Sequence, residues 1–309
     1  MQNTFESSNL LHKDIFVKRN KIKKSRVKKS RGEIVLYSVM FIIILINCLT
    51  IVGAFAITVV NSFKDPFDYA LGNTWKLPTM GWHIENYIEI FSTLEVNGTY
   101  FGGMLWNSLW QTLGQLLLTI ASTAMASYAY AKYKFFGRKA IFFIVVVLLT
   151  ISLPGSIPAT YKLYSDLHMR NSYLFLIGCT AGFGANFLIF VGFWRSIDWA
   201  YAEAAYIDGA SEWQVFVKVM IPQGLPIMGV SIINGFIAQW LSADPSMLYL
   251  PEMPSLGYGL WVYQQRSAGG MNYPVFFAAL IVVAIPSVIA FICLHDKTIK
   301  AMNLGGLKG

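Results

Sequence analysis

The residues best suited to act on another molecule are concentrated in one segment of mixed polarity, Arg195 to Met220. Glu203 and Asp208 supply fixed charges that can set the register of a partner. Small side chains around them leave a low surface that another protein's backbone can approach: Ala200, Ala202, Ala204 and Ala205. The chemistry indicated is docking rather than catalysis, although this composition alone also fits an ordinary helix at a membrane interface.

Local signals predict how this segment folds. Asp198 is a suitable N-cap for a short helix, because its side chain can accept a hydrogen bond from a backbone N–H. Asp208-Gly209 predicts the turn that ends this helix, since glycine tolerates the left-handed conformation. Ser211 and Gln214 have the spacing of a capping box, which predicts a second helix running until Pro222. We therefore expect a short helix, a sharp bend and a second helix that enters the membrane.

Residues typical of enzymes and metal sites do not form a recognisable group. The histidines and cysteines are scattered without metal-ligand spacing: His12, His83, His168, His295, Cys48, Cys179 and Cys293. The glycine-rich loop that holds ATP phosphates, G-x-x-x-x-G-K-[S/T], occurs nowhere in the sequence. An intramembrane enzyme is therefore disfavoured, and we expect no catalytic residue, metal or cofactor in this chain.

Six uncharged windows predict the elements that position the docking segment. They are Ile34–Asn61, Leu105–Ala131, Ala140–Tyr161, Asn171–Trp194, Val219–Ala243 and Met271–Leu294. The shortest has 22 residues, and a helix of that length measures roughly 33 Å, enough to cross a hydrocarbon core of about 30 Å. A soluble bundle is disfavoured because it needs charges on its outward faces. The predicted fold is an all-α polytopic membrane protein with six transmembrane helices.

Lysine and arginine predict the orientation of these helices. Nineteen of the 24 lie in the N-terminal arm, in the loops after the second and fourth windows, or after the sixth window. This asymmetry places both termini in the cytoplasm. The basic run Lys18–Arg31 is better explained by orientation and by contact with anionic lipid than by nucleic-acid binding.

The windows divide the chain into five parts. These are a basic cytoplasmic arm (1–33), the first transmembrane helix (34–61), an external loop (62–104), a five-helix core (105–294) that contains the docking segment (196–222), and a cytoplasmic tail (295–309). Aromatic residues in the external loop, among them Trp75, Trp82 and Phe91, predict that part of it packs as a small cap.

The docking segment keeps the spacing of a known motif. Glu203-Ala204-Ala205 is followed by Gly209, six residues after the glutamate, and then by Val219, Ile221 and Pro222. The pattern resembles the EAA loop of binding-protein-dependent ABC importer permeases, and the run from Glu203 to Pro222 is similar to their maltose-type, carbohydrate-uptake branch. Leu77-Pro78, Glu85-Asn86-Tyr87 and the glycine-bearing tail resemble the second permease subunit of that branch. The likeness leaves out the basic arm.

The resemblance implies the type I permease fold of ABC importers, in a bacterial plasma membrane. The implied partners are a sister permease, two ATPases that hold ATP and Mg, an extracellular solute-binding protein, membrane lipid and a sugar. The implied ATPase-coupling residues are Glu203, Ala204, Ala205, Asp208, Gly209 and Pro222. Asp198 departs from the pattern, because many relatives have a proline before this helix.

A sugar path needs hydrogen-bonding groups and aromatic faces. The candidates in the fourth and fifth windows are Asn186, Asn234, Gln239 and Trp240. Each can instead bond or pack between helices, and Trp240-Leu241-Ser242-Ala243 departs from the Trp-Asn-Asp/Glu that is frequent in the branch. The absence of charged residues from all six windows disfavours an ion-coupled carrier. A permease for another solute, such as an amino acid or a polyamine, stays an alternative to sugar import.

Overall fold

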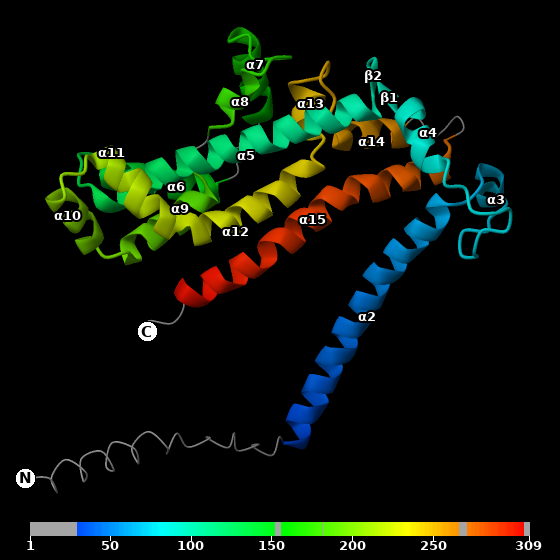
Figure 1. Ribbon diagram of the computed structural model, residues 1–309, viewed down its shortest axis with the longest axis horizontal. Helices are drawn as coiled ribbons and strands as arrows, with labels where there is room; N and C mark the ends of the chain where they lie inside the picture. The colour runs from blue at the N-terminus through cyan, green and yellow to red at the C-terminus, as the bar shows by residue number, and fades with distance from the viewer. Residues whose placement is uncertain (1–29, 152–155, 181, 266–270, 306–309) are drawn as a thin grey trace, which may run out of the picture. The chain divides into compact units, whose positions relative to one another are not determined.

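The computed structural model of the protein describes residues 30–151, 156–180, 182–265 and 271–305, so most of the predicted basic arm lies outside the described residues. The described part is helical apart from one short antiparallel hairpin, which confirms the all-α class (Figure 1). The helices are α2 Arg31–Ser62, α3 Pro66–Ala70, α4 Asn86–Thr93, α5 Phe101–Lys132, α6 Arg138–Thr150, α7 Ser156–Asp166, α8 Phe175–Gly178, α9 Ala185–Ser196, α10 Ala200–Ile207, α11 Glu212–Gln214, α12 Ile221–Trp240, α13 Asp244–Leu248, α14 Leu256–Gln265 and α15 Tyr273–Gly305. A π-helical turn, Val215–Met220, joins α11 to α12, and the hairpin pairs β1 Glu95–Val96 with β2 Thr99–Tyr100.

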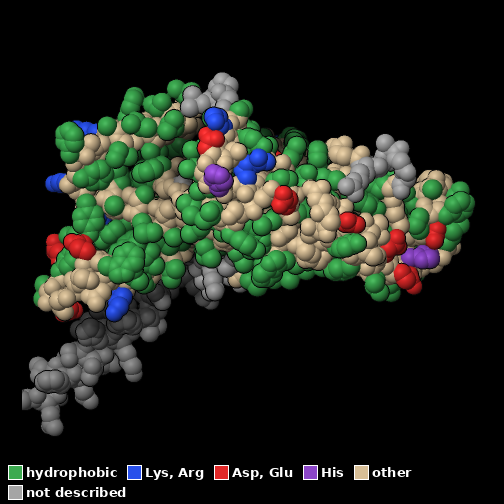
Figure 2. Space-filling model, turned by 90° about the horizontal axis from the view of Figure 1, so that it is seen from above, with side chains coloured by type: hydrophobic (Ala, Val, Ile, Leu, Met, Phe, Trp, Pro, Cys, Tyr) green, Lys and Arg blue, Asp and Glu red, His purple; other side chains and the backbone are tan. Residues whose placement is uncertain are grey.

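The chain divides into two compact units, Met1–Ala54 and Phe55–Gly309, and the long apolar helix α2 runs from the first into the second. Three described stretches are long and apolar enough to cross a membrane, and they coincide with the first, fifth and sixth predicted windows: Arg31–Ser62, Glu212–Trp240 and Tyr273–Cys293. The second window is also a single helix, the 32-residue α5. Hydrophobic side chains cover much of the face shown in Figure 2, as expected where lipid or another membrane protein replaces water.

The third and fourth windows are not single helices in the described part of the chain. The third window contains α6, which ends at Thr150, and the start of α7, with residues 152–155 outside the description. The fourth contains α8 and α9, separated by a segment that includes Gly182 and Gly184. Glycine weakens helices and allows close packing: a β-carbon at Gly178 would lie 2.1 Å from the Tyr164 hydroxyl.

Helix α5 is the central element of the second unit. It packs along α9 and α12, and α12 packs along α15 (Figure 1). One cluster of buried side chains surrounds Phe101 and Trp240 at the N-terminal end of α5. Another surrounds Trp194 and Met220 at its C-terminal end and joins α5 to α9, α10 and the start of α12. This second cluster positions the predicted docking segment.

Both polar contacts and aromatic packing hold the segment 62–104: the Phe63 ring contacts the rings of Trp82 and Tyr87, and the Phe91 ring contacts that of Phe101. Lys64 is fully buried, and its Nζ donates to Asn61 Oδ1 at 2.7 Å and to the Asn73 carbonyl at 2.7 Å. Asp68, also fully buried, accepts hydrogen bonds from the backbone N–H and the hydroxyl of Thr79. By contrast, Trp75 is 83% exposed. The predicted packed cap therefore exists, but Trp75 does not form its core.

Candidate functional site

The predicted short helix is α10, and Asp198 bonds to its N-terminus. The Asp198 carboxylate accepts a hydrogen bond from the N–H of Ala200, with an N–O distance of 3.1 Å. The helix begins at Ala200 rather than Trp199, a difference of one residue. The N-cap residue is thus Trp199 and not Asp198 as predicted, but the Asp198 carboxylate still satisfies a backbone N–H at the start of the helix.

Gly209 ends α10 in a complete Schellman motif. Its φ is +80°, its N–H donates to the Tyr206 carbonyl at 3.0 Å, and the N–H of Ala210 donates to the Ala205 carbonyl at 3.0 Å. A β-carbon at this position would meet no atom within 4 Å. Glycine is therefore required by the left-handed backbone and not by crowding, which confirms the predicted turn.

The predicted capping box restarts the helix. The N–H of Gln214 donates to Ser211 Oγ at 3.4 Å, and the Gln214 side chain accepts from the N–H of Ser211 at 2.9 Å. We call residues 198–214, which contain α10, the turn and α11, the elbow.

The prediction that the second helix ends at Pro222 is wrong. The helical path continues from Glu212 to Trp240 through the π-helical turn Val215–Met220. Pro222 lies inside this continuous path, directly after the π-helical turn, which is the kind of local irregularity found where the regular hydrogen-bond ladder of a helix is interrupted. The Gln223 side chain donates to the Val219 carbonyl at 3.1 Å and satisfies an acceptor at the junction. The elbow is thus continuous with a helix long enough to cross a membrane.

Helix α10 has a buried face and an outward face. Ala202 is fully buried in the cluster around Trp194. Glu203, Ala204, Asp208 and Gly209 are exposed, whereas Ala205 is half-buried. Ile207 projects at the tip of the helix and is 86% exposed. The structure therefore brings five of the six predicted coupling residues to one elbow, and Pro222 lies on the adjoining helix.

Contacts from α5 and α9 hold the elbow at one end of the helix bundle. Lys132, at the end of α5, donates through Nζ to the Ile197 carbonyl at 2.6 Å, and its ammonium lies 5.6 Å from the centre of the Trp199 ring. The buried Trp194 indole donates to Ser127 Oγ at 2.9 Å. These links join α9 and the start of the elbow to α5.

A carboxylate inside the elbow receives two phenol groups. Tyr206 in α10 donates to Glu212 Oε2 at 2.7 Å, and Tyr133, which follows α5, donates to the same oxygen. Burial and the hydrogen bond to Glu212 raise the pKa of Tyr133 and of Tyr206. Both phenols therefore stay protonated donors at neutral pH. Sequence reasoning missed Tyr133 and Glu212, because they are 79 residues apart and no local pattern links them.

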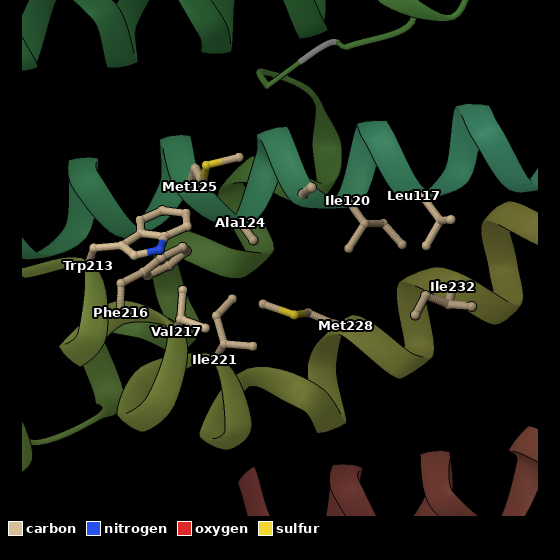
Figure 3. Close-up of a pocket in the computed structure, with 11 residues that line it drawn as sticks. Leu117, Ile120, Ala124, Met125, Trp213, Phe216, Val217, Ile221, Met228 and Ile232 are labelled. Atoms are coloured by element: carbon tan, nitrogen blue, oxygen red, sulfur yellow. The ribbon is translucent and has the colours of Figure 1, made fainter.

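An apolar groove lies between α5 and the helix that follows the elbow (Figure 3). Its volume is about 290 Å³ and its lining contains no charged side chain. Trp213, Phe216 and Met228 face the groove opposite Leu117 and Ile120. The groove beside α5 is thus apolar, whereas Glu203 and Asp208 lie on the exposed surface of α10 and its turn.

The predicted path residues do not form a single site. Asn186 accepts a hydrogen bond from Ser231 Oγ at 3.4 Å, and Asn234 is exposed. Gln239 Oε1 is buried and has no hydrogen-bond partner among the described residues. Trp240 is 1% exposed, its indole N–H donates to the Val283 carbonyl at 2.9 Å, and its ring stacks on Phe236. The proposal that Trp240 offers a face to sugar is not supported, because its ring belongs to the core.

The sequence is similar to those of known transport proteins. The family model described as the binding-protein-dependent transport system inner membrane component matches residues 98–295. The chain is 27% identical to the diacetylchitobiose uptake system permease protein NgcG of Streptomyces coelicolor, over 77% of this chain and 78% of that protein. It is 28% identical to the arabinooligosaccharides transport system permease protein AraQ of Halalkalibacterium halodurans, over 73% and 80%. It is 29% identical to the maltose/maltodextrin transport system permease protein MalG of Yersinia pestis, over 68% and 72%.

A solved structure shares the fold. It is a bacterial ABC transporter involved in the import of the acidic polysaccharide alginate, and it matches with a TM-score of 0.70 and 20% identity over 87% of this chain and 98% of that chain. The family match covers more than half of the sequence and includes α5, the elbow and α12. The chain therefore belongs to the family of inner membrane components of binding-protein-dependent transport systems.

Proposed function

We propose that this chain is a permease subunit of an ATP-driven importer for a sugar or an oligosaccharide, and that the elbow is where a separate ATPase docks. The observation that supports the docking site most directly is the form of the elbow. Its exposed surface carries Glu203 and Asp208 on a low alanine-rich helix, and its far end continues as a membrane-length helix. Only the four-residue turn Asp208 to Ser211 separates α10 from the helical path that leads into α12.

The proposed complex contains a sister permease, two cytoplasmic ATPases that bind ATP and Mg²⁺, and an extracellular solute-binding protein. ATP hydrolysis belongs to the ATPases, and this chain provides a path through the membrane. The distribution of lysine and arginine supports an orientation with both termini and the elbow in the cytoplasm. The segment 62–104 is then external, where the binding protein delivers solute.

Each coupling residue has a distinct proposed role. Glu203 and Asp208 set the register of the ATPase through charge, and Ala204 and Ala205 allow close backbone approach. Gly209 sets the bend, and Pro222 lies where the elbow passes into α12.

The solute is proposed to be a sugar because the relatives named above are transport proteins for diacetylchitobiose, arabinooligosaccharides and maltodextrin. Asn186, Asn234 and Gln239 stay candidate contacts for sugar hydroxyls. Gln239 is the most suggestive of these, since a buried acceptor without a partner costs free energy until a donor arrives. An amino-acid or polyamine importer would share the elbow but not this set of relatives.

Co-purification and uptake test the proposal together. The complex is isolated through a tag on this chain, and uptake of labelled oligosaccharides, amino acids and polyamines is measured in proteoliposomes supplied with the binding protein. We expect an ATPase to co-purify and only sugar to be taken up. Glu203→Lys and Gly209→Asp should leave membrane insertion intact and detach or uncouple the ATPase. Normal sugar uptake by both variants with the ATPase attached would contradict the docking assignment, and uptake of a non-sugar solute alone would contradict the substrate class.

A further inference from the structure

Glu212 links three elements that are separate in the sequence. It is the first residue of α11, and its Oε2 atom accepts hydrogen bonds from Tyr206 of α10 and from Tyr133 at the end of α5. Hydrogen bonds to an ionised acceptor are stronger than those between neutral groups. One carboxylate therefore braces the short helix against both the helix that follows it and the central helix of the bundle.

Aromatic contacts also connect α10 to the end of α5. The Trp199 ring contacts both phenol rings, with its centroid 6.3 Å from that of Tyr133 and 6.2 Å from that of Tyr206. Lys132 also contacts the Trp199 ring and donates to the Ile197 carbonyl. The start of α10, its last turn and the start of α11 are all tied to the end of α5.

The bend itself gives little resistance to a change of angle. Four residues, Asp208 to Ser211, separate α10 from α11, and they include a glycine with a positive φ. Glycine moves between backbone conformations with less restriction than other residues. Without a brace across the bend, a force on α10 would change the angle at Gly209 before it moved the membrane helices.

We propose that Glu212, held by Tyr133 and Tyr206, is a positioning residue that makes the elbow move as one body with α5 and α12. This inference rests on the proposed function, because it concerns how movement of a docked ATPase reaches the membrane. The brace transmits the movement of α10 that would otherwise be absorbed at the bend. Val215 and Met220, both fully buried in the same cluster, extend the rigid connection into α12.

The test uses the assembled complex and the variants Glu212→Gln, Glu212→Ala, Tyr133→Phe and Tyr206→Phe. The phenylalanine variants keep each ring and remove one hydroxyl. Tyr130→Phe is the matched control, because Tyr130 lies near the end of α5 but packs against Phe142 of α6 and Phe187 of α9. Two quantities are measured: hydrogen exchange of the amides in 200–211 without nucleotide, and solute transported per ATP hydrolysed.

For Glu212→Ala we expect faster exchange in the elbow and a fall of about threefold or more in solute transported per ATP, since residues along the connection between two coupled sites modulate that coupling. Glu212→Gln keeps one acceptor oxygen and should have a smaller effect than Glu212→Ala, while Tyr130→Phe should behave as wild type. ATP hydrolysis should continue in every variant. An unchanged transport-to-ATP ratio, with or without faster exchange, would overturn the proposal. A wild-type complex without an ATPase would contradict the proposed function itself, which is visible before any variant is compared.

Discussion

At Gly209 the backbone alone selects the residue. Its φ of +80° belongs to the left-handed region, and the space around a β-carbon is open. The two hydrogen bonds of the Schellman motif, which involve Tyr206 and Ala205, depend on this conformation. Substitutions at Gly209 therefore separate the effect of backbone shape from that of side-chain contact.

Gly209→Val should open the turn, because a β-branched residue in the left-handed region costs about 1–2 kcal/mol. Gly209→Asn should perturb it less, since asparagine adopts this region more readily than other residues with a β-carbon. Hydrogen exchange at the amides of 209 and 210 checks the prediction. Equal exchange in the two variants would show that the left-handed conformation of the turn does not determine which residues position 209 accepts.

Asp68 gives the folded protein a dependence on acid pH. The N–H and hydroxyl of Thr79 and the Asn73 amide all donate to its carboxylate and lower its pKa from 3.8 to about 2. A lowered pKa stabilises the fold fully at pH values above the unfolded pKa, and the contribution is lost as the pH falls toward the folded pKa.

The melting temperature of purified wild-type protein should therefore fall between pH 5 and pH 2.5, and Asp68→Asn should remove part of that fall. Thermal unfolding across this range, followed by circular dichroism, makes the comparison. Asp68→Asn is also expected to be less stable at pH 7, because it replaces an acceptor of three hydrogen bonds. Parallel pH curves for the two proteins would exclude Asp68 as a source of the dependence.

At the scale of elements, glycines on one helix have different roles. A β-carbon at Gly224 of α12 would lie 2.5 Å from the Trp194 ring, whereas one at Gly229 meets no atom within 4 Å. The Trp194 ring is held by its hydrogen bond to Ser127 and is fully buried, so it has little room to move.

Gly224→Ala should destabilise the protein by about 1–3 kcal/mol, the usual cost of overpacking a filled core. Gly229→Ala is the matched variant on the same helix and should be neutral or stabilising by up to about 1 kcal/mol, because alanine favours helix. Thermal stability of the purified variants decides between these outcomes. A loss as large for Gly229→Ala as for Gly224→Ala would show that helix flexibility, rather than contact with Trp194, governs both positions.

Elements set by neighbouring residues could be predicted from the sequence, and elements set by packing could not. Asp198 and Ser211 act within three residues of themselves, so their hydrogen bonds to backbone N–H groups at helix starts follow from local spacing. Pro222 was expected to end a helix, but the helical path continues through it, directly after the π-helical turn. Composition alone predicts the fourth window as one helix. The structure has two short helices there, α8 and α9, with a break between them.

At the scale of the whole molecule, the site was predicted in part. The residues proposed to couple to the ATPase follow one another along the chain, so their place on one exposed elbow could be predicted from spacing, whereas their role stays a prediction. The hydrogen bond from Tyr133 to Glu212 was not predictable from the sequence, because it depends on how closely the end of α5 packs against the elbow. Trp240 was assigned to a solute path from its type, whereas its contacts with Phe236 and Val283 place it in the core.

Photo-crosslinking at matched exposed positions tests most directly whether the elbow is the docking site for the ATPase. A photoreactive amino acid replaces Ile207, which is 86% exposed at the elbow, or Trp75, which is 83% exposed in the segment that follows α3. Figure 1 shows α3 and α10 at opposite ends of α5. In the intact complex, position 207 should form a covalent product with the ATPase and position 75 should not. An ATPase product from position 75, or none from position 207, would contradict docking at the elbow.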